Sequence, residues 1–164
     1  MKKTLFVLLC LMISLTAARG GDKITTTNPE RLPVQARKFL SEHFSDTRIS
    51  VIKIEPKGSA TTYDVLMENG VAVAFNHKGM WTEMDAKVGS VPQSAIPTDI
   101  LQYARDRFPG CEVQAAKRDG KNTEIKLSNR TELMFNAKGE PIDRKKEPPT
   151  IDGRPATPRI STNQ

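Results

Sequence analysis

The side chains best suited to catalysis or to metal binding are few and widely spaced in this chain. Two histidines, His43 and His77, and one cysteine beyond the N-terminal segment, Cys111, are the candidate bases, nucleophiles and ligands. A structural zinc site takes about four Cys or His ligands in paired spacing, and a nucleophilic cysteine needs a base and an oxyanion site around it. Neither pattern is present, so we predict no enzyme activity, no metal and no cofactor.

Each of these residues also has an ordinary structural explanation. His43 falls at the edge of a predicted helix and His77 in a tight turn. Cys111 fits a buried small residue, with a free thiol for intermolecular pairing as the alternative. The carboxylate pair Glu83 and Asp85 could do general acid–base chemistry, but a solvated strand edge explains it better.

Residues 1–20 have the three parts of a secretory signal, namely a basic start, an apolar run and a group of small residues. The apolar run, residues 5–15, is shorter than the roughly 20 residues that a membrane helix needs. We therefore predict cleavage after Ala18 or Gly20, no transmembrane anchor, and a periplasmic or secreted product. A lipid-modified Cys10 is the alternative, and the bulky residue before it argues against this.

The positive charge is concentrated at the two ends of the chain. The formal charge of +6 falls to 23 − 19 = +4 without Lys2 and Lys3, and five basic against three acidic residues from Pro141 onward account for +2 of it. A nucleic-acid partner is not expected, because such a protein clusters Lys and Arg on one face with aromatic residues between them. The proline-rich tail, residues 144–164, lacks apolar periodicity, so we expect it to be flexible, as a spacer, a docking strand or an inert terminus.

The remaining chain contains one pattern twice. Residues 21–30 form a polar lead, and an apolar stripe with helical spacing follows. The stripe recurs 64 residues later, each time with a proline at its start, where a proline suits the first turn of a helix. Its members are Leu32, Ala36, Phe39, Leu40 and Phe44 in the first copy and Ile96, Ile100, Tyr103, Ala104 and Phe108 in the second.

After each stripe the apolar period changes to two, which is typical of strands. Asn69-Gly70 predicts a type I′ hairpin turn in the first copy, and its counterpart in the second is Ser128-Asn129-Arg130. The strand residues match at a shift of 60 rather than 64, so the first copy has four extra residues, which Pro56–Ser59 could hold. Opening strands near 49–55 and 112–118, and closing turns at 76–79 and 136–139, complete the two units.

We therefore predict an α+β protein of two tandem repeats, residues 31–90 and 91–143. Each repeat is a helix followed by an antiparallel meander of three or four strands. Side by side they form one sheet with both helices on one face and the other face open. The predicted core is Phe39, Leu40, Phe44, Val65, Met67, Val73, Phe75, Tyr103, Phe108, Ile125, Leu127, Leu133 and Phe135.

In these features the chain resembles the β-lactamase-inhibitor-like, PepSY-like periplasmic proteins. The resemblance implies a tandem helix-plus-sheet fold whose concave, helix-free face can bind a partner protein, as β-lactamase inhibitor proteins bind their enzyme. Those inhibitors have a disulfide in each repeat, whereas Cys111 is alone here beyond the signal, so inhibition of a β-lactamase does not carry over. The resemblance rests on the signal, Leu32-Pro33, Ile96-Pro97, the stripes ending in Phe44 and Phe108, Asn69-Gly70, and residues 75–81 and 135–139.

The open face is the candidate binding site. An apolar patch within it would mark an interaction with a protein partner of unknown identity, such as an exported enzyme; the alternative is an envelope-associated structural protein that self-associates through this face. Trp81 could be an anchor for the partner or could pack over the sheet edge. The candidate face consists of Asp64, Leu66, Ala72, Ala74, Trp81, Lys126 and Met134.

Overall fold

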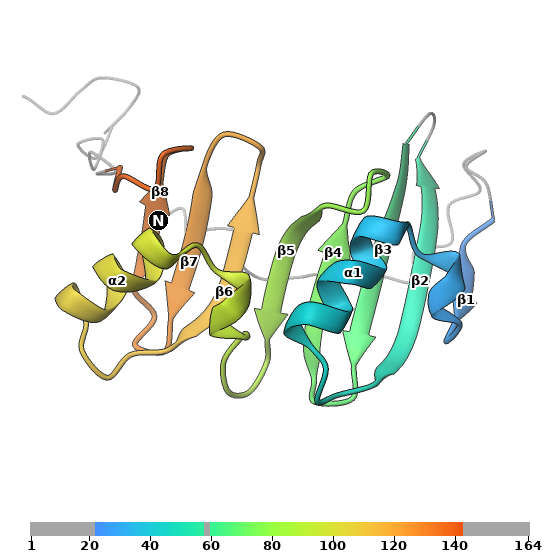
Figure 1. Cartoon of the computed structure of the whole chain (residues 1–164), viewed down its shortest axis with the longest axis horizontal. Coiled ribbons are helices and arrows are strands. Elements are labelled where there is room, and N and C mark those ends of the chain that lie inside the picture. Colours follow the sequence, from blue (N-terminus) through green and yellow to red (C-terminus); the bar gives the residue numbers. More distant parts are fainter. Residues whose placement is uncertain (1–21, 58–59, 143–164) are drawn as a thin grey trace, which may run out of the picture.

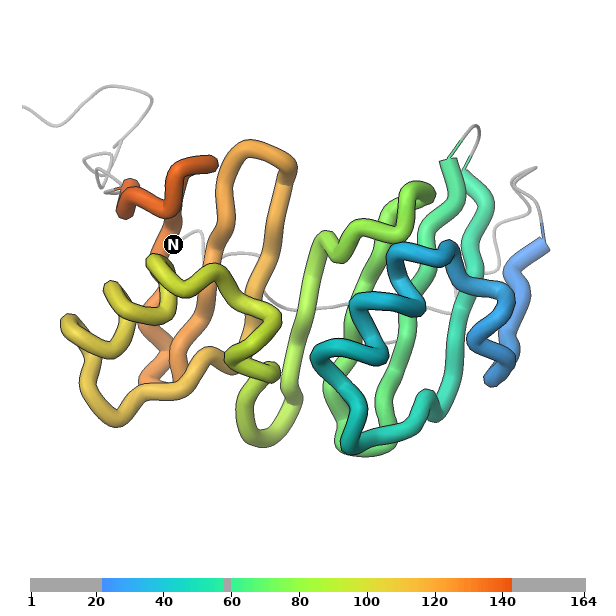
Figure 2. The backbone as a smooth tube through the Cα atoms, in the orientation of Figure 1, coloured from blue at the N-terminus to red at the C-terminus, as the bar shows by residue number. Residues whose placement is uncertain are grey.

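The fold is built on a single antiparallel sheet in which the strands follow one another in chain order (Figure 2). The computed structural model describes residues 22–57 and 60–142. The predicted signal peptide with Cys10, and the predicted tail from residue 144 onward, lie outside the described residues. The eight strands are β1 (Ile24–Thr26), β2 (Ile49–Lys57), β3 (Ala60–Met67), β4 (Val71–Phe75), β5 (Trp81–Ala86), β6 (Val113–Arg118), β7 (Thr123–Leu127) and β8 (Glu132–Phe135).

Two helices lie on the same face of this sheet (Figure 1). α1 (Val34–His43) and α2 (Thr98–Arg107) begin directly after Pro33 and Pro97, whose fixed φ, −54° in both, suits the start of a helix. Each helix buries small and apolar residues of its stripe, and these are Ala36, Leu40, Ile100 and Ala104. The predicted α+β class with both helices on one face is thereby confirmed.

The core lies between the helices and the sheet, and it has the predicted composition. Nine of the thirteen predicted core residues are buried, because alternate strand positions point toward the helices. The other four, Phe39, Tyr103, Phe108 and Leu133, are partly buried and pack against the same cluster.

The hairpin turns differ from the predicted type. A type I′ turn needs positive φ at both central residues, but in the first repeat Gly70 is the residue with positive φ, +84°, and Asn69 is not. The backbone N–H of Gly70 donates to the carbonyl of Met67 over 3.0 Å, which describes a type I turn followed by a left-handed residue. At the matching place in the second repeat, Arg130 has φ +69°.

Two further segments differ from expectation. Part of the polar lead is structured, because Ile24–Thr26 pairs with β2 as an edge strand and Pro29–Arg31 forms a 3-10 turn, η1. The four extra residues of the first repeat lengthen its β2–β3 hairpin, in which pairing runs on to Lys57 and Ala60. Pro56 therefore lies in a strand and not in a loop.

The two repeats meet at the centre of the sheet. β5 and β6 pair over three residues each, with Met84 opposite Ala116 at the middle. On the helix side, Nδ1 of His43 at the end of α1 lies 2.9 Å from Oγ of Ser94 in the second 3-10 turn, η2 (Gln93–Ala95). The repeats thus share both a ladder of backbone hydrogen bonds and a side-chain contact.

Candidate functional site

The helix-free face consists of the strand residues that alternate with the core. The strand register aligns these residues in rows that cross both repeats. One row contains Lys53, Asp64, Ala74, Glu83, Lys117, Glu124 and Met134; the next contains Val51, Leu66, Ala72, Asp85, Ala115, Lys126 and Glu132.

The apolar part of this face lies over the first repeat. Leu66 lies opposite Val51 on one side and Ala72 on the other, with Ala74 in the neighbouring row. The Leu66 side chain is 39% exposed although it sits in the interior of the sheet. An exposed leucine among small side chains can be reached by a flat partner surface.

The part over the second repeat is charged, with both signs interleaved. Glu83 lies opposite Lys117, and Lys117 lies opposite Glu124. Lys126 lies opposite Glu132 in the next row. Pairs of opposite charge on neighbouring strands stabilise a sheet modestly, and together they give this half of the face a fixed pattern of charge.

Asp64 is one of four charged residues that the first repeat contributes to these two rows, together with Lys53, Glu83 and Asp85. Burial among its neighbours raises the pKa of the Asp64 carboxyl above its ordinary value, and the negative charge of Glu55 adds to this effect. Glu55 itself has a lowered pKa, chiefly because Lys23 donates a hydrogen bond to it over 2.9 Å. Asp64 therefore presents a partly desolvated carboxyl group to whatever covers this face.

Six of the seven predicted face residues lie on the helix-free side, and Trp81 does not. Trp81 is 6% exposed, lies opposite Phe75 and packs beneath α1, with its ring centroid 6.3 Å from that of Phe39. The interpretation of Trp81 as an exposed anchor is wrong. It does not cover a sheet edge either, because β5 is a central strand.

Four further residues of the helix-free face, which were not predicted, lie in strands whose bounds the sequence indicates only loosely. Val51 and Lys53 of β2, and Ala115 and Lys117 of β6, lie on the helix-free face. The signal was present in the alternation with the buried residues of these strands. Glu83 and Asp85 also lie there, in the middle of the sheet rather than at a solvated edge.

The residues that could have supported catalysis are spread over the molecule. His77 is exposed in its turn, Cys111 is partly buried against the core, and the His43 ring contacts that of Phe39 at a tilt of 57°, with the centroids 4.6 Å apart. Within residues 22–57 and 60–142, no three His, Cys, Asp or Glu side chains are grouped so that they could hold a metal ion. In the same ranges no helix has the length and apolar character to cross a membrane.

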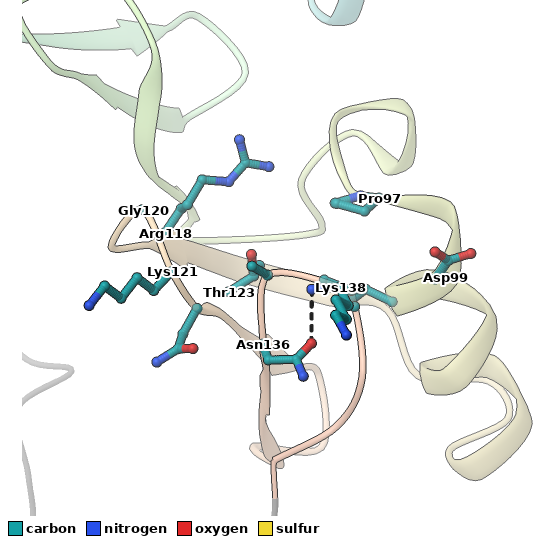
Figure 3. A pocket seen from close by; sticks show the side chains of 12 residues that line it. Pro97, Asp99, Arg118, Gly120, Lys121, Thr123, Asn136 and Lys138 are labelled. Atoms are coloured by element: carbon teal, nitrogen blue, oxygen red, sulfur yellow. Dashed lines mark hydrogen bonds between the residues drawn. The ribbon is translucent and has the colours of Figure 1, made fainter.

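A second feature lies on the helix side. Two cavities, of about 310 and about 300 Å³, are both lined by Arg118, which is not among the predicted site residues. The first borders the start of α2 and contains Lys121 and Lys138 (Figure 3). The second borders α1 and contains Met80 and Trp81.

Comparison with known proteins places the chain in a family. Residues 61–143 match the family described as "Putative beta-lactamase-inhibitor-like, PepSY-like". No protein with curated annotation matches the chain.

Three similar solved structures come from Bacteroides. A putative calcium-regulated periplasmic protein from Bacteroides thetaiotaomicron is 38% identical, with 74% of this chain and 94% of that chain covered and a TM-score of 0.69. A putative periplasmic protein of unknown function from Bacteroides vulgatus is 35% identical, with 74% and 98% covered and the same TM-score. Another putative periplasmic protein from Bacteroides vulgatus is 32% identical, with 75% and 96% covered, again at 0.69. The chain therefore belongs to the PepSY-like, β-lactamase-inhibitor-like family.

Proposed function

We propose that this chain is an exported, periplasmic protein-binding module, inhibitor-like in its mode of action, that docks another protein on its helix-free face. The observation that carries the proposal is the exposure of Leu66, on the interior strand β3, on a sheet face on which neither α1 nor α2 lies. The family supports the choice of a protein as partner, because its description is inhibitor-like. The periplasmic descriptions of the three solved relatives support the compartment.

The two halves of the face would contribute differently to such an interface. Apolar contact with Leu66, Ala72 and Ala74 would supply affinity, because burying apolar surface is favourable at about 25 cal/mol per Å². The charge rows over the second repeat would select the partner and its orientation, because unmatched charges at an interface are costly. The partner we expect therefore has an apolar protrusion beside a pattern of complementary charges.

Site-specific photo-crosslinking in the producing cell tests this proposal. A photoreactive amino acid is placed at Leu66, and at Val88 as the matched control. Val88 is an exposed apolar residue, 87% accessible, in the loop between β5 and η2. We expect a crosslinked partner from position 66 and none from position 88. Equal crosslinking from both positions would contradict the proposal.

A binding measurement then follows with the purified partner. Leu66→Asp with Met134→Asp should weaken its affinity at least ~10-fold, a loss of about 1.4 kcal/mol, whereas Val88→Asp should leave it unchanged. Crosslinks from position 66 to other copies of the same chain only would instead establish the alternative, self-association through this face. Sedimentation of the wild type and the double variant would then show an oligomer that the substitutions dissociate.

A further inference from the structure

The two cavities on the helix side are joined through one side chain. Arg118, the last residue of β6, lines both of them. Its neighbour in the ladder is Thr123, which is buried on the helix side of the sheet. Arg118 therefore projects between the two repeats, on the face opposite to that of Leu66.

The first cavity exists because the second repeat lacks bulk where the first repeat has it. The shifts of 64 and 60 match Arg118 with Ile54 and Thr123 with Tyr63, and these two residues are paired in each repeat. Tyr63 packs against the core, and a threonine fills much less space. Thr123 therefore leaves more room beside it than Tyr63 does, and Arg118 and Thr123 line the cavity with polar groups where the first repeat has Ile54 and Tyr63.

Arg118 is held in place but lacks a polar partner. Its guanidinium carbon lies 4.2 Å from the centroid of the Trp81 ring, a cation–π contact. Among the described residues the guanidinium makes no hydrogen bond and no ion pair. Since none of its N–H donors is engaged by a described residue, they are available for a carboxylate.

The first cavity has an excess of positive charge. Arg118, Lys121 and Lys138 line it against one carboxylate, that of Asp99. Neither lysine has an ion pair within the part of the chain that the structure describes. Among the lining residues, three cations thus stand against one anion, which favours a ligand with several negative charges. Two further carboxylates adjoin the lining, because Asp119 lies between Arg118 and Gly120, and Glu140 accepts a hydrogen bond from Asn136.

The second cavity has an apolar wall. Met80 is 55% exposed, although it lies between a buried glycine and the buried Trp81. Phe39 completes this wall, and the charges at its rim, Lys38 and Glu42, face each other across 3.8 Å. A flexible thioether beside aromatic rings suits an apolar side chain of variable shape.

We propose that the two cavities form one groove, which we call the inter-repeat groove, and that it binds an extended acidic protein segment. Carboxylates of the segment pair with Arg118, Lys121 and Lys138, and an apolar side chain of the same segment lies on Met80. The occupant is a peptide rather than a single small anion, because the cations come from β6, the β6–β7 turn and the turn after β8, and the apolar wall lies beyond Arg118. This surface is separate from the helix-free face.

Trp81 provides the first measurement, since it is the only tryptophan in the chain and lies in contact with Arg118. The probe is a peptide of four glutamates with a leucine at each end, which allows either direction of binding. Its control has glutamines in place of the glutamates. We expect a saturable change in Trp81 fluorescence with the acidic peptide, with a dissociation constant below ~1 mM at about 0.15 M salt.

Charge reversal at exposed lysines tests the location of the site. Lys121→Glu with Lys138→Glu should weaken binding at least ~10-fold and leave Trp81 with its Arg118 neighbour. The matched control is Lys53→Glu with Lys117→Glu, the same change in net charge on the helix-free face. Arg118→Gln should weaken binding similarly by calorimetry. If Arg118→Gln does not fold, the comparison of the two lysine double variants is sufficient to test the location of the site.

The inference is overturned by any of three results. These are no saturable signal up to ~1 mM peptide, equal binding of the glutamine peptide, and equal weakening by the two lysine pairs. Leu66→Asp with Met134→Asp should leave peptide binding unchanged. The inter-repeat groove and the proposed helix-free interface can therefore fail independently of each other.

Discussion

The two repeats close with the same turn, yet the turn packs differently in each. Asn76 accepts hydrogen bonds from the backbone N–H groups two and four residues later, and Asn136 does the same. Gly79 and Gly139 follow with the same φ of +78°. The local sequence therefore determines the turn itself in both repeats.

The surroundings of the two glycines are what differ. A Cβ atom on Gly79 would lie 2.8 Å from the backbone nitrogen of Ala36 and 2.8 Å from Cβ of Pro33, at the start of α1. A Cβ atom on Gly139 would meet only the Asp99 side chain, at 3.3 Å or more. The first turn thus packs tightly against the start of α1, whereas the second leaves more room beside α2, and each of the two glycines lines one of the cavities.

The aromatic residues show the same contrast. Phe39 contacts the rings of His43, Phe44, Phe75 and Trp81. Its counterpart Tyr103 contacts the ring of Phe135, with the centroids 5.5 Å apart. The first repeat therefore packs its aromatic residues and its closing turn more closely than the second, although one cavity borders the helix of each repeat.

The largest effect should come from a methyl group added at the closing turns. Gly79→Ala should lower the free energy of unfolding by about 3 kcal/mol, because the strain of positive φ adds to overpacking against α1. Gly139→Ala should cost about 1 to 2 kcal/mol, mainly from the backbone conformation. Denaturation in urea followed by circular dichroism measures both. Equal losses would show that the two turns are equally packed.

A smaller effect should come from the hairpin turns, where the second repeat has a strained residue. Arg130→Gly should raise the free energy of unfolding by about 1 kcal/mol, since glycine tolerates the φ of +69°. Gly70→Ala should lower it by a similar amount, because Gly70 has φ +84° and open space around its Cα atom. A loss of stability in Arg130→Gly would mean that the arginine side chain makes a contact worth more than the strain.

The smallest effect concerns the dependence of stability on pH. The raised pKa of Asp64 means that the folded protein holds this proton more tightly, so stability falls as pH rises from the ordinary value of 3.8 through the raised one. Asp64→Asn should remove this dependence of stability on pH. It should raise the free energy of unfolding at neutral pH by at most about 0.5 kcal/mol.

Asp119 in the second repeat provides the opposite case. Backbone N–H groups of Asn122 and Lys121 donate to its carboxylate and lower its pKa, so its contribution is lost as pH falls through that lowered value. Asp119→Asn should therefore remove a contribution to stability that increases with pH, which is the opposite of the effect of Asp64→Asn. Unfolding curves of both variants between about pH 3 and pH 7 test the pair, and slopes of the same sign would contradict it.

Periodicity in the sequence was sufficient to predict the helices, the sheet and most of the core. Each predicted helix and strand had to bury its apolar residues, so the spacing of those residues showed which face of the element points to the core. Counting residues could not have placed Trp81, because the register shifts between Ala74 and Phe75 at the β4–β5 pairing. Beyond a β-bulge, the alternation of side chains along a strand no longer shows on which face of the sheet a residue lies.

The inter-repeat groove could not be predicted in the same way. Arg118 occupies a helix-facing position, but a charged residue at a strand end ordinarily turns to solvent. Its contact with Trp81 joins residues of different repeats, and no spacing in the sequence encodes that contact. Only the comparison of Ile54 with Arg118 and of Tyr63 with Thr123 held a signal, as an apolar pair replaced by a polar one.

The order of the strands has a consequence for how the chain reaches its folded state. Every strand from β2 onward pairs with the strand that precedes it in the chain, so no strand must wait for a distant partner. Contacts between neighbouring segments form faster than contacts between remote ones. A chain delivered N-terminus first could complete α1 and β2–β5 while β6–β8 are still arriving. We expect the first repeat to serve as the template whose edge, β5, starts the second.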